Sequence, residues 1–168
     1  MVELRVLGPD DWRLWRELRL AALTEAPPAF EATLADWQGN GDREERWRAR
    51  LAIPGSHNVI ALAGDRPLGM VSGVPIGEGV VELISLWVGP AARGRGVGDR
   101  LVEEIVRWAR RSGAATLRLS VMDSNRAARA LYERHGFQGS EEPDARRQLV
   151  LVKALRRPGE PGRSGQST

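Results

Sequence analysis

The sequence predicts an α/β fold, and three observations lead to this prediction. Apolar runs typical of strands alternate along the chain with stretches whose apolar residues recur at helical spacing. The most apolar run, at residues 80–88, leads through a glycine-rich turn into an amphipathic stretch at 98–111. The 168 residues, of which 42% are hydrophobic and 28% charged, suffice for one soluble core. Elements that alternate in this way pack as a sheet covered by helices.

The first third of the chain predicts one strand and two helices. Residues 3–7 form the strand, and Pro-Asp-Asp at 9–11 supplies the N-cap of a helix that the prolines at 27–28 end. A Gly-Asn-Gly turn at 39–41 precedes a charged helix at 42–51. The first helix presents to the core the side chains of Trp12, Trp15, Leu18 and Ala22.

The middle of the chain predicts three strands. Runs at 58–63 and 68–74 are separated by a Gly-Asp-Arg-Pro segment, which favours a hairpin. The run at 80–88 is apolar on both faces apart from Glu82 and Ser85, and this pattern is typical of a central strand.

The last third predicts two helices and two strands. A helix at 98–111 is followed by a strand at 116–121, and the strands on either side of this helix should be parallel. The second helix lies between a Ser-Asn cap at 124–125 and a stop at Gly136, and the last strand covers 148–155.

Domain organisation and compartment follow from composition. We expect a single domain at residues 1–156 and a disordered tail at 157–168, which has almost no apolar side chains. No signal-peptide pattern and no membrane-length apolar run is present, so we expect a cytoplasmic protein without a membrane partner. With no cysteine, a disulfide, a thiolate nucleophile and a thiolate metal site are excluded, and we assign no residue to a metal.

The charge balance argues against nucleic acid. The 25 basic and 22 acidic residues give a net charge of +3, whereas a surface that follows phosphates needs clustered positive charge. The one dense cluster is Arg93, Arg95 and Arg100. A homodimer is one possible oligomeric state, but the sequence pattern does not locate the apolar patch that a dimer interface would need.

The turn at 88–98 is the most informative segment. Its last three glycines allow a sharp turn that exposes consecutive N–H groups at a helix start, where unpaired donors favour an anion. Arg93 and Arg95 add charge-assisted donors for phosphate oxygens. The alternative is a tight β–α connection with solvated arginines. The P-loop and Rossmann fingerprints do not fit, since the turn has no lysine and its glycine spacing differs.

Two patterns in this half of the chain resemble a known family. V-x-P-x-x-R-G-x-G-x-G-x-x-L, from Val88 to Leu101, resembles the acetyl-coenzyme A signature of the GNAT (Gcn5-related N-acetyltransferase) superfamily. N-x-x-A-x-x-L-Y-x-x-x-G-F, from Asn125 to Phe137, resembles the second signature of that family. The direct resemblance covers residues 80–137.

The resemblance implies a fold and a cofactor, acetyl-coenzyme A (acetyl-CoA). The fold is a mixed, mostly antiparallel central sheet with a splayed parallel strand pair, flanked by helices on both faces. In that family the loop amides, here 93–98, hold the pyrophosphate. By position, the backbone of Leu86 would polarise the thioester carbonyl and that of Val88 would pair with pantetheine. The cofactor-binding residues that the resemblance implies are Leu86, Trp87, Val88, Arg93, Gly94, Arg95, Gly96, Val97, Gly98, Asn125, Ala128 and Tyr132.

The resemblance also implies two catalytic residues. Glu82 resembles the general base of some family members, and desolvation in an apolar strand would raise its pKa. Tyr132 falls on the position of the acid that protonates the leaving thiolate. The alternatives are a structural carboxylate paired with an arginine for Glu82 and a core aromatic for Tyr132. Asn125 alternatively only caps its helix.

Three other residues are weaker candidates for the base. Glu78 lies on a turn, where a carboxylate is normally solvated, and His57 lies in a loop. We expect His135 to interact with the last carbonyls of its helix.

We therefore expect an N-acetyltransferase, an acyltransferase that moves the acetyl group of acetyl-CoA to a primary amine by direct attack in a ternary complex and releases coenzyme A. The expected acceptor is a small molecule, and the alternative is a protein N-terminus or lysine. A non-catalytic acyl-coenzyme A sensor is a further alternative. The segment around Trp37 and Trp47 occupies the part of the chain that commonly lines the acceptor site in this family.

Overall fold

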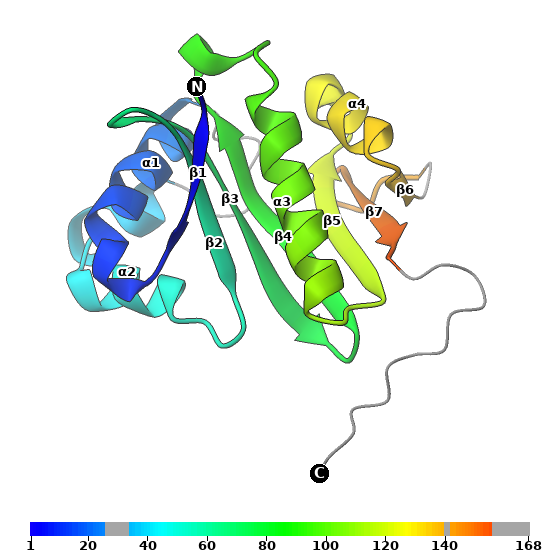
Figure 1. Cartoon of the computed structure of the whole chain (residues 1–168), viewed down its shortest axis with the longest axis horizontal. Helices are drawn as coiled ribbons and strands as arrows, with labels where there is room; N and C mark the ends of the chain where they lie inside the picture. The colour runs from blue at the N-terminus through cyan, green and yellow to red at the C-terminus, as the bar shows by residue number, and fades with distance from the viewer. Residues whose placement is uncertain (26–33, 140–141, 156–168) are drawn as a thin grey trace.

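The computed structural model describes residues 1–25, 34–139 and 142–155 (Figure 1). Within these ranges the chain forms a seven-stranded sheet in the order β1-β2-β3-β4-β5-β7-β6. The neighbouring strands β4 and β5 are parallel, and the other neighbouring pairs are antiparallel. The strands are β1 (Glu3–Leu7), β2 (His57–Ala63), β3 (Arg66–Gly77), β4 (Val80–Val88), β5 (Thr116–Met122), β6 (Gln138–Gly139) and β7 (Gln148–Ala154).

Four α-helices cover the two faces of this sheet (Figure 1). Helices α1 (Trp12–Glu25) and α2 (Glu44–Leu51) pack on one face. Helix α3 (Val97–Arg111) crosses the opposite face, and α4 (Arg126–Arg134) lies beside it at the end of the sheet formed by β5, β6 and β7. The mixed sheet with one parallel pair and helices on both faces confirms the predicted fold class.

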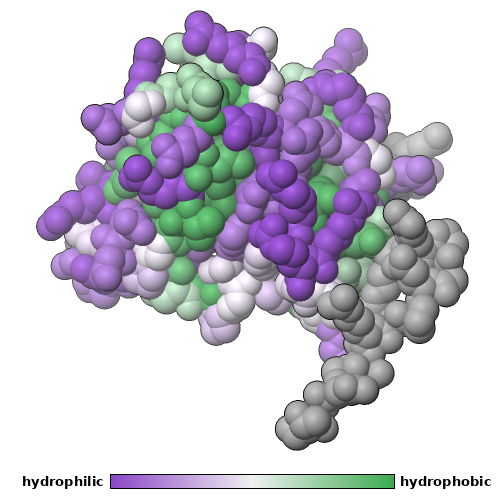
Figure 2. All heavy atoms as spheres, viewed as in Figure 1, coloured by the Kyte–Doolittle hydropathy of each residue, from purple (hydrophilic) through white to green (hydrophobic). Residues whose placement is uncertain are grey.

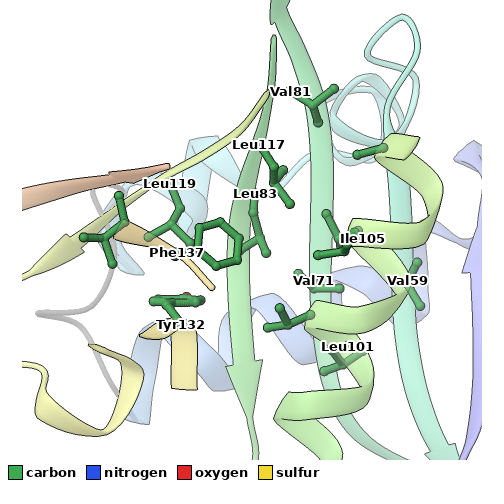
Figure 3. Packing of buried hydrophobic residues seen from close by; sticks show 14 of the residues in the cluster. Val59, Val71, Val81, Leu83, Leu101, Ile105, Leu117, Leu119, Tyr132 and Phe137 are labelled. Atoms are coloured by element: carbon green, nitrogen blue, oxygen red, sulfur yellow. The ribbon is translucent and has the colours of Figure 1, made fainter. Parts of the chain in front are cut away.

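Strand alternation divides the core into two clusters, one on each face of the sheet. On β2, Val59 and Ala61 belong to the cluster under α3, whereas Ile60 and Leu62 belong to the cluster under α1 and α2. Figure 3 shows the first cluster, in which Leu101 and Ile105 of α3 face Val59 and Val71 of the sheet. The second cluster contains the fully enclosed rings of Trp15 and Trp47.

Most predicted elements are confirmed within two or three residues, and the exceptions are short. The Gly39–Gly41 segment is a 3-10 turn, and α2 begins two residues after the expected start. Strand β6 has two residues, too few to leave a period in the sequence. The expected helix stop at 27–28 and the tail at 157–168 lie outside the described residues.

Hydrophilic side chains cover much of the face seen in Figure 2, and hydrophobic surface shows between them. On the edge strand β1, Val6 is 57% exposed. None of the helices in the described ranges is both long and apolar enough to cross a bilayer.

Candidate functional site

The strands β4 and β5 separate halfway along their length. Their pairing covers three positions and ends where Glu82 lies opposite Arg118. Between its pairs with Met70 and Ser72 of β3, strand β4 has one residue more than its partner, which is a β-bulge. Ser85, inside the bulge, has a φ of +58°, and Leu86 has no register partner in either neighbouring strand. The bulge therefore turns β4 away from β5 and opens a gap beside Leu86.

A cleft of about 780 Å³ lies at this gap. Its walls come from the last residue of α1, the end of β4, the turn before α3 and one side of α4. The predicted residues that lie on it are Leu86, Trp87, Val88, Arg93, Gly94, Gly96, Val97, Gly98, Asn125 and Ala128. Residues far apart in the sequence thus meet around one space, as the two sequence patterns predict.

The turn between β4 and α3 exposes a row of backbone donors. Gly94 and Gly96 have φ values of +77° and +78°, a conformation that favours glycine. The N–H groups of residues 94–98 donate to no acceptor in the part of the chain that the structure describes. Helix α3 begins at Val97, so the positive end of its dipole adds to these donors. Unpaired backbone donors at a helix start favour an anion.

Gly98 lets three elements approach one another closely. A Cβ atom at this position would lie 3.2 Å from Leu131 Cδ2 of α4 and 3.7 Å from Val88 Cγ2 of β4. Contacts at the shorter distance are tighter than most side chains tolerate. A side chain at the third glycine of the turn would therefore need Leu131 to shift, whereas the backbone angles favour glycine at the other two positions.

An ion pair crosses one end of the cleft. Arg93 Nη2 lies 2.7 Å from Glu25 Oε2, and the same oxygen accepts a hydrogen bond from Trp87 Nε1 at 2.9 Å. The hydrogen bonds from Arg93 and then Trp87 lower the pKa of Glu25. Arg93 Nε also donates to the Val88 carbonyl at 3.1 Å. Arg93 is thus held along the cleft wall by protein contacts, and half of its side chain stays exposed.

A second charged group connects the start of α3 to the end of α4. Asp99 Oδ1 lies 2.8 Å from His135 Nε2 and 3.1 Å from Arg134 Nη2. The hydrogen bond with His135 lowers the pKa of Asp99, and the bond from Arg134 acts in the same direction. The predicted interaction of His135 with the last carbonyls of its helix is made by its backbone N–H, which donates to the Tyr132 carbonyl at 3.1 Å, whereas its ring contacts Asp99.

Asn125 performs the capping role that its position predicts. Its Oδ1 accepts a hydrogen bond of 3.2 Å from the backbone N–H of Ala128, at the first turn of α4. Asn125 and Ala128 both line the cleft. The cap therefore fixes the side of α4 that faces the cleft.

Tyr132 and Arg95 are not on the cleft wall. Tyr132 is 6% exposed and packs edge-on against Phe137, with 5.7 Å between the ring centroids (Figure 3). Burial raises the pKa of its hydroxyl, so this group stays protonated at neutral pH. Arg95 is exposed to solvent. The roles predicted for both residues stay predictions.

Glu82 lies in β4 between Val74 of β3 and Arg118 of β5. Its neighbours Val81 and Leu83 point into the cluster under α3, so strand alternation directs Glu82 to the face covered by α1 and α2. It is partly buried and lies outside the cleft wall. A base on the face opposite α3 requires the acceptor amine to approach from that side.

The weaker candidates for the base, Glu78 and His57, lie away from the cleft. Glu78 is exposed on the turn between β3 and β4. His57 lies at the start of β2, where its Nε2 is 3.1 Å from Glu104 Oε1 and its ring stacks on Trp108. Neither residue reaches the cleft.

Seven residues that line the cleft are not among the predicted site residues: Glu25, Ala92, Asp99, Ala127, Ala130, Leu131 and Arg134. Three of them, Ala127, Ala130 and Leu131, lie on α4 on the same side as Asn125 and Ala128. Helical spacing from Asn125 and Ala128 could therefore have predicted that they line the cleft. Glu25 reaches the cleft from an element 60 residues away in the chain, and no local pattern marks it.

Comparisons with known proteins agree with this geometry. Residues 15–137 match the model of the acetyltransferase (GNAT) family. The chain is 36% identical over 91 residues to the N-alpha-acetyltransferase RimI of Mycobacterium tuberculosis, which covers 52% of this chain and 56% of that protein. It is 27% identical over 142 residues to the mycothiol acetyltransferase of Renibacterium salmoninarum, and the match covers 81% of this chain and 40% of that protein. The chain thus spans only about half the length of these relatives.

Solved structures show the same fold. The PaiA N-acetyltransferase of Thermoplasma acidophilum, in complex with coenzyme A, matches with a TM-score of 0.74 at 19% identity, over 92% of this chain and 99% of that one. The acetyltransferase YncA of Salmonella typhimurium, with acetyl-CoA, matches with a TM-score of 0.74 at 19% identity, over 96% of this chain and 98% of that one. Because the family match covers most of the chain and the fold agrees, this chain belongs to the acetyltransferase (GNAT) family.

Proposed function

We propose that this chain is an N-acetyltransferase that moves the acetyl group of acetyl-CoA to a primary amine by direct attack in a ternary complex. The observation that carries the proposal is the row of unengaged N–H groups at residues 94–98, beside a cleft of about 780 Å³ that leads to the gap in the sheet. Two solved structures with the same fold contain coenzyme A or acetyl-CoA, which supports this choice of cofactor.

The cofactor site divides into two parts by chemistry. The backbone donors of 94–98 and the start of α3 would bind the pyrophosphate. The backbone of Leu86, which has no register partner, would donate to the thioester carbonyl and stabilise the negative charge that develops there. Ala127, Ala128 and Leu131 give the opposite wall an apolar surface suited to pantetheine.

In the proposed reaction the amine nitrogen forms a bond to the acetyl carbon, and the bond from that carbon to sulfur breaks. An amine with a lysine-like pKa of about 10.4 is mostly protonated at neutral pH, so a base must first remove a proton. We assign this step to Glu82, directly or through water. When the tetrahedral intermediate collapses, the hydroxyl of Tyr132 gives its proton to the leaving sulfur, and the nitrogen loses its second proton to water, which leaves the neutral amide.

The acceptor in this proposal is a small molecule, and coenzyme A is the second product. A protein N-terminus is the second candidate, since the relative from M. tuberculosis is named as an N-alpha-acetyltransferase. A sensor that binds acyl-coenzyme A without turnover is the candidate from another class.

Thiol release from acetyl-CoA, measured with a panel of small amines and of peptides with free N-termini, tests the proposal. We expect amine-dependent thiol release and micromolar binding of coenzyme A in calorimetry. Release with peptides alone would favour the second candidate. Tight binding with no turnover across the panel would favour the sensor, and the absence of both would refute the proposal.

A further inference from the structure

A largely buried arginine lies on the face of the sheet that α1 and α2 cover. Arg50, on α2, donates to Asn58 Oδ1 of β2 at 3.1 Å, to Ser72 Oγ of β3 at 3.1 Å and to Ser85 Oγ of β4 at 3.3 Å. Its guanidinium also lies over the ring of Trp15, 5.2 Å from the centroid. These contacts fix the guanidinium at the level of the β4 bulge.

The positive charge of Arg50 has no anionic counterpart among the described residues. Its three hydrogen-bond partners are neutral, and no carboxylate oxygen of these residues lies within 4.0 Å of its nitrogens. A guanidinium has five N–H donors, so these bonds leave two of them for another acceptor. A buried charge is normally paired, because burial without a counter-charge is costly.

A second arginine increases the positive charge in this region. Arg19 of α1 is 9% exposed, and burial together with the charge of Arg50 lowers its pKa to about 10. Burial alone lowers the pKa of Arg50 to about 10. Both groups stay protonated at neutral pH.

The position of Arg50 relates it to the reaction. Ser85, which accepts from Arg50, is covalently joined to Leu86, which lines the cleft. Glu25 of α1 and Trp87, whose ring packs against the cluster under α1 and α2, line the same cleft, so the cleft also borders the side of the sheet on which Arg50 lies. Glu82, the proposed base, points to the same face of β4. A negative group held by Arg50 would therefore lie beside the point of acetyl transfer.

We propose that Arg50 binds the carboxylate of the acceptor, which makes the acceptor a small amino acid with its primary amine close to its carboxylate. Because Arg50 contacts the bulge beside the cleft-lining Leu86, a carboxylate that it binds would lie near the reacting amine, and these two groups are close together in an α-amino acid. This inference rests on the proposed function and adds the chemical class of the acceptor. Arginine suits this role because its planar donor groups bind carboxylates in a fixed orientation.

A panel of the standard L-amino acids, each paired with its amide, which lacks the carboxylate, tests this inference. We expect the wild-type protein to use the best amino acid with a kcat/KM at least tenfold above that of its amide. In Arg50→Gln this preference should disappear, so that the kcat/KM values for the amino acid and its amide lie within about threefold of each other. Arg50→Lys, which keeps the charge, should retain part of the preference. Arg48→Gln, an exposed arginine of the same helix, should keep all of it.

Three outcomes would overturn the inference. If the amides have the same kcat/KM as the amino acids, the carboxylate site is refuted and the acetyltransferase proposal stays intact. An equal loss of both substrate types in Arg50→Gln would make Arg50 a structural link between strands. If no amine is acetylated, binding of the amino acids to the protein with coenzyme A bound is measured by calorimetry. The carboxylate site is refuted if the amino acids do not bind, or if Arg50→Gln does not change their affinity. Failure to bind coenzyme A would instead refute the proposed function.

Discussion

The backbone angles of a few residues shape the cleft. Gly94 and Gly96 adopt φ values near +78°, which glycine reaches without steric cost, and Ser85 adopts +58° without that freedom. Strain at a residue that is not glycine is retained only when its surroundings hold it in place. At Ser85 the surroundings include the hydrogen bond from Arg50, which links the bulge to α2.

The variant Gly96→Ala should weaken coenzyme A binding about tenfold. A left-handed conformation costs an alanine about 1–2 kcal/mol, so the turn would relax and its N–H groups would no longer converge. Calorimetry with coenzyme A measures the change. Gly8→Ala is the matched control, since Gly8 has a φ of −111° and open space around it. Equal affinity in the two variants would show that the turn does not need its present shape.

The variant Tyr132→Phe should lower kcat by at least tenfold and change the affinity for coenzyme A by less than threefold. Removal of the hydroxyl deletes a proton donor, while the ring that packs on Phe137 stays. Steady-state rates and calorimetry on the same preparation separate the two effects. An unchanged kcat would leave Tyr132 as a core aromatic only.

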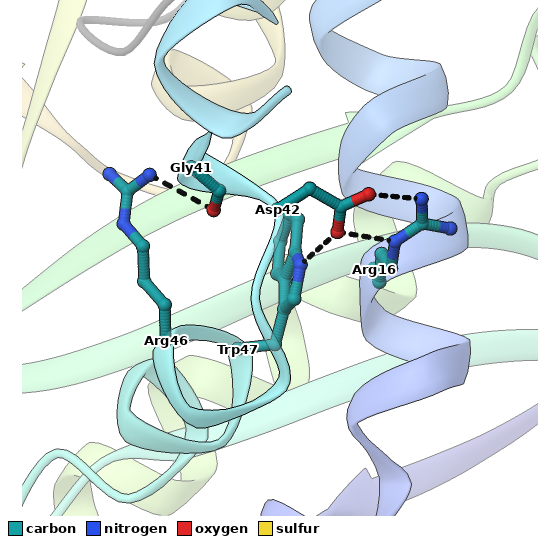
Figure 4. Close-up of polar contacts among 5 residues, drawn as sticks. All are labelled: Arg16, Gly41, Asp42, Arg46 and Trp47. Carbon is teal, nitrogen blue, oxygen red and sulfur yellow. Dashed lines mark hydrogen bonds and ion pairs between the residues drawn. The ribbon is translucent and has the colours of Figure 1, made fainter. Parts of the chain in front are cut away.

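Contacts between elements place the helices on the sheet. Helix α1 and the segment before α2 are joined through Asp42, which accepts from Arg16 Nε at 2.7 Å and from Trp47 Nε1 at 2.8 Å (Figure 4). On the opposite face, α3 lies so close to β3 that a Cβ at Gly73 would be 2.3 Å from Trp108 Cζ3. The contact at Asp42 is polar, and the contact at Gly73 is steric.

The variant Asp42→Asn should lose about 1 kcal/mol of unfolding free energy at pH 7. The hydrogen bonds from Arg16 and then Trp47 lower the pKa of Asp42 from 3.8 to about 2. A lowered folded-state pKa means that the stabilisation is present above pH 4 and is lost as the pH falls toward 2. Urea unfolding between pH 2 and 7 should show the two proteins converging at low pH. Asp10→Asn, at an exposed ion pair, should change little.

The variant Gly73→Ala should destabilise the fold by about 1–3 kcal/mol, because the added methyl group must displace the indole of Trp108 from β3. Replacing Trp108 by leucine in the same chain should reduce the penalty of the alanine, and a double-mutant cycle in urea measures this coupling. Gly77→Ala, at the open end of the same strand, serves as the control. Additive effects would mean that the two positions do not meet.

The whole molecule is organised around the central strand β4. Three strands lie on each side of it, and it contacts α3 on one face while its bulge receives Arg50 from the other. The cleft uses residues from both ends of the described chain, from Glu25 to Arg134. A ligand in the cleft would therefore contact elements from both halves of the fold.

Coenzyme A should consequently raise the stability of the whole protein. At a concentration one hundred times its Kd, a ligand that binds only the folded state adds about 2.7 kcal/mol. For a protein of this size the melting temperature should rise by roughly 5–10 °C. Scanning calorimetry measures the shift, and Gly96→Ala should show a smaller one at the same concentration. An unchanged melting temperature would contradict the assignment of the cleft.

The sequence by itself predicted the elements and the exposed donors of the turn before α3, because these depend on local properties. Helical and strand periods need only neighbouring residues, and the left-handed backbone angles at Gly94 and Gly96 favour glycine at those positions. The signatures from Val88 to Leu101 and from Asn125 to Phe137 also lie within single stretches. The sequence therefore predicted the parallel pair, and the resemblance to the GNAT family implied the mixed sheet and most of the residues that line the cleft.

Only the tertiary structure decided which distant side chains meet. It brought Glu25 to Arg93, His135 to Asp99 and Arg50 to Ser85. It also placed Tyr132 in the core, where the sequence left a site residue and a core aromatic as alternatives. No local period encodes such contacts, since they depend on how helices pack across a twisted and bulged sheet. The contacts on the face under α1 and α2 are therefore fixed by packing, whereas the turn before α3 is fixed by local backbone geometry.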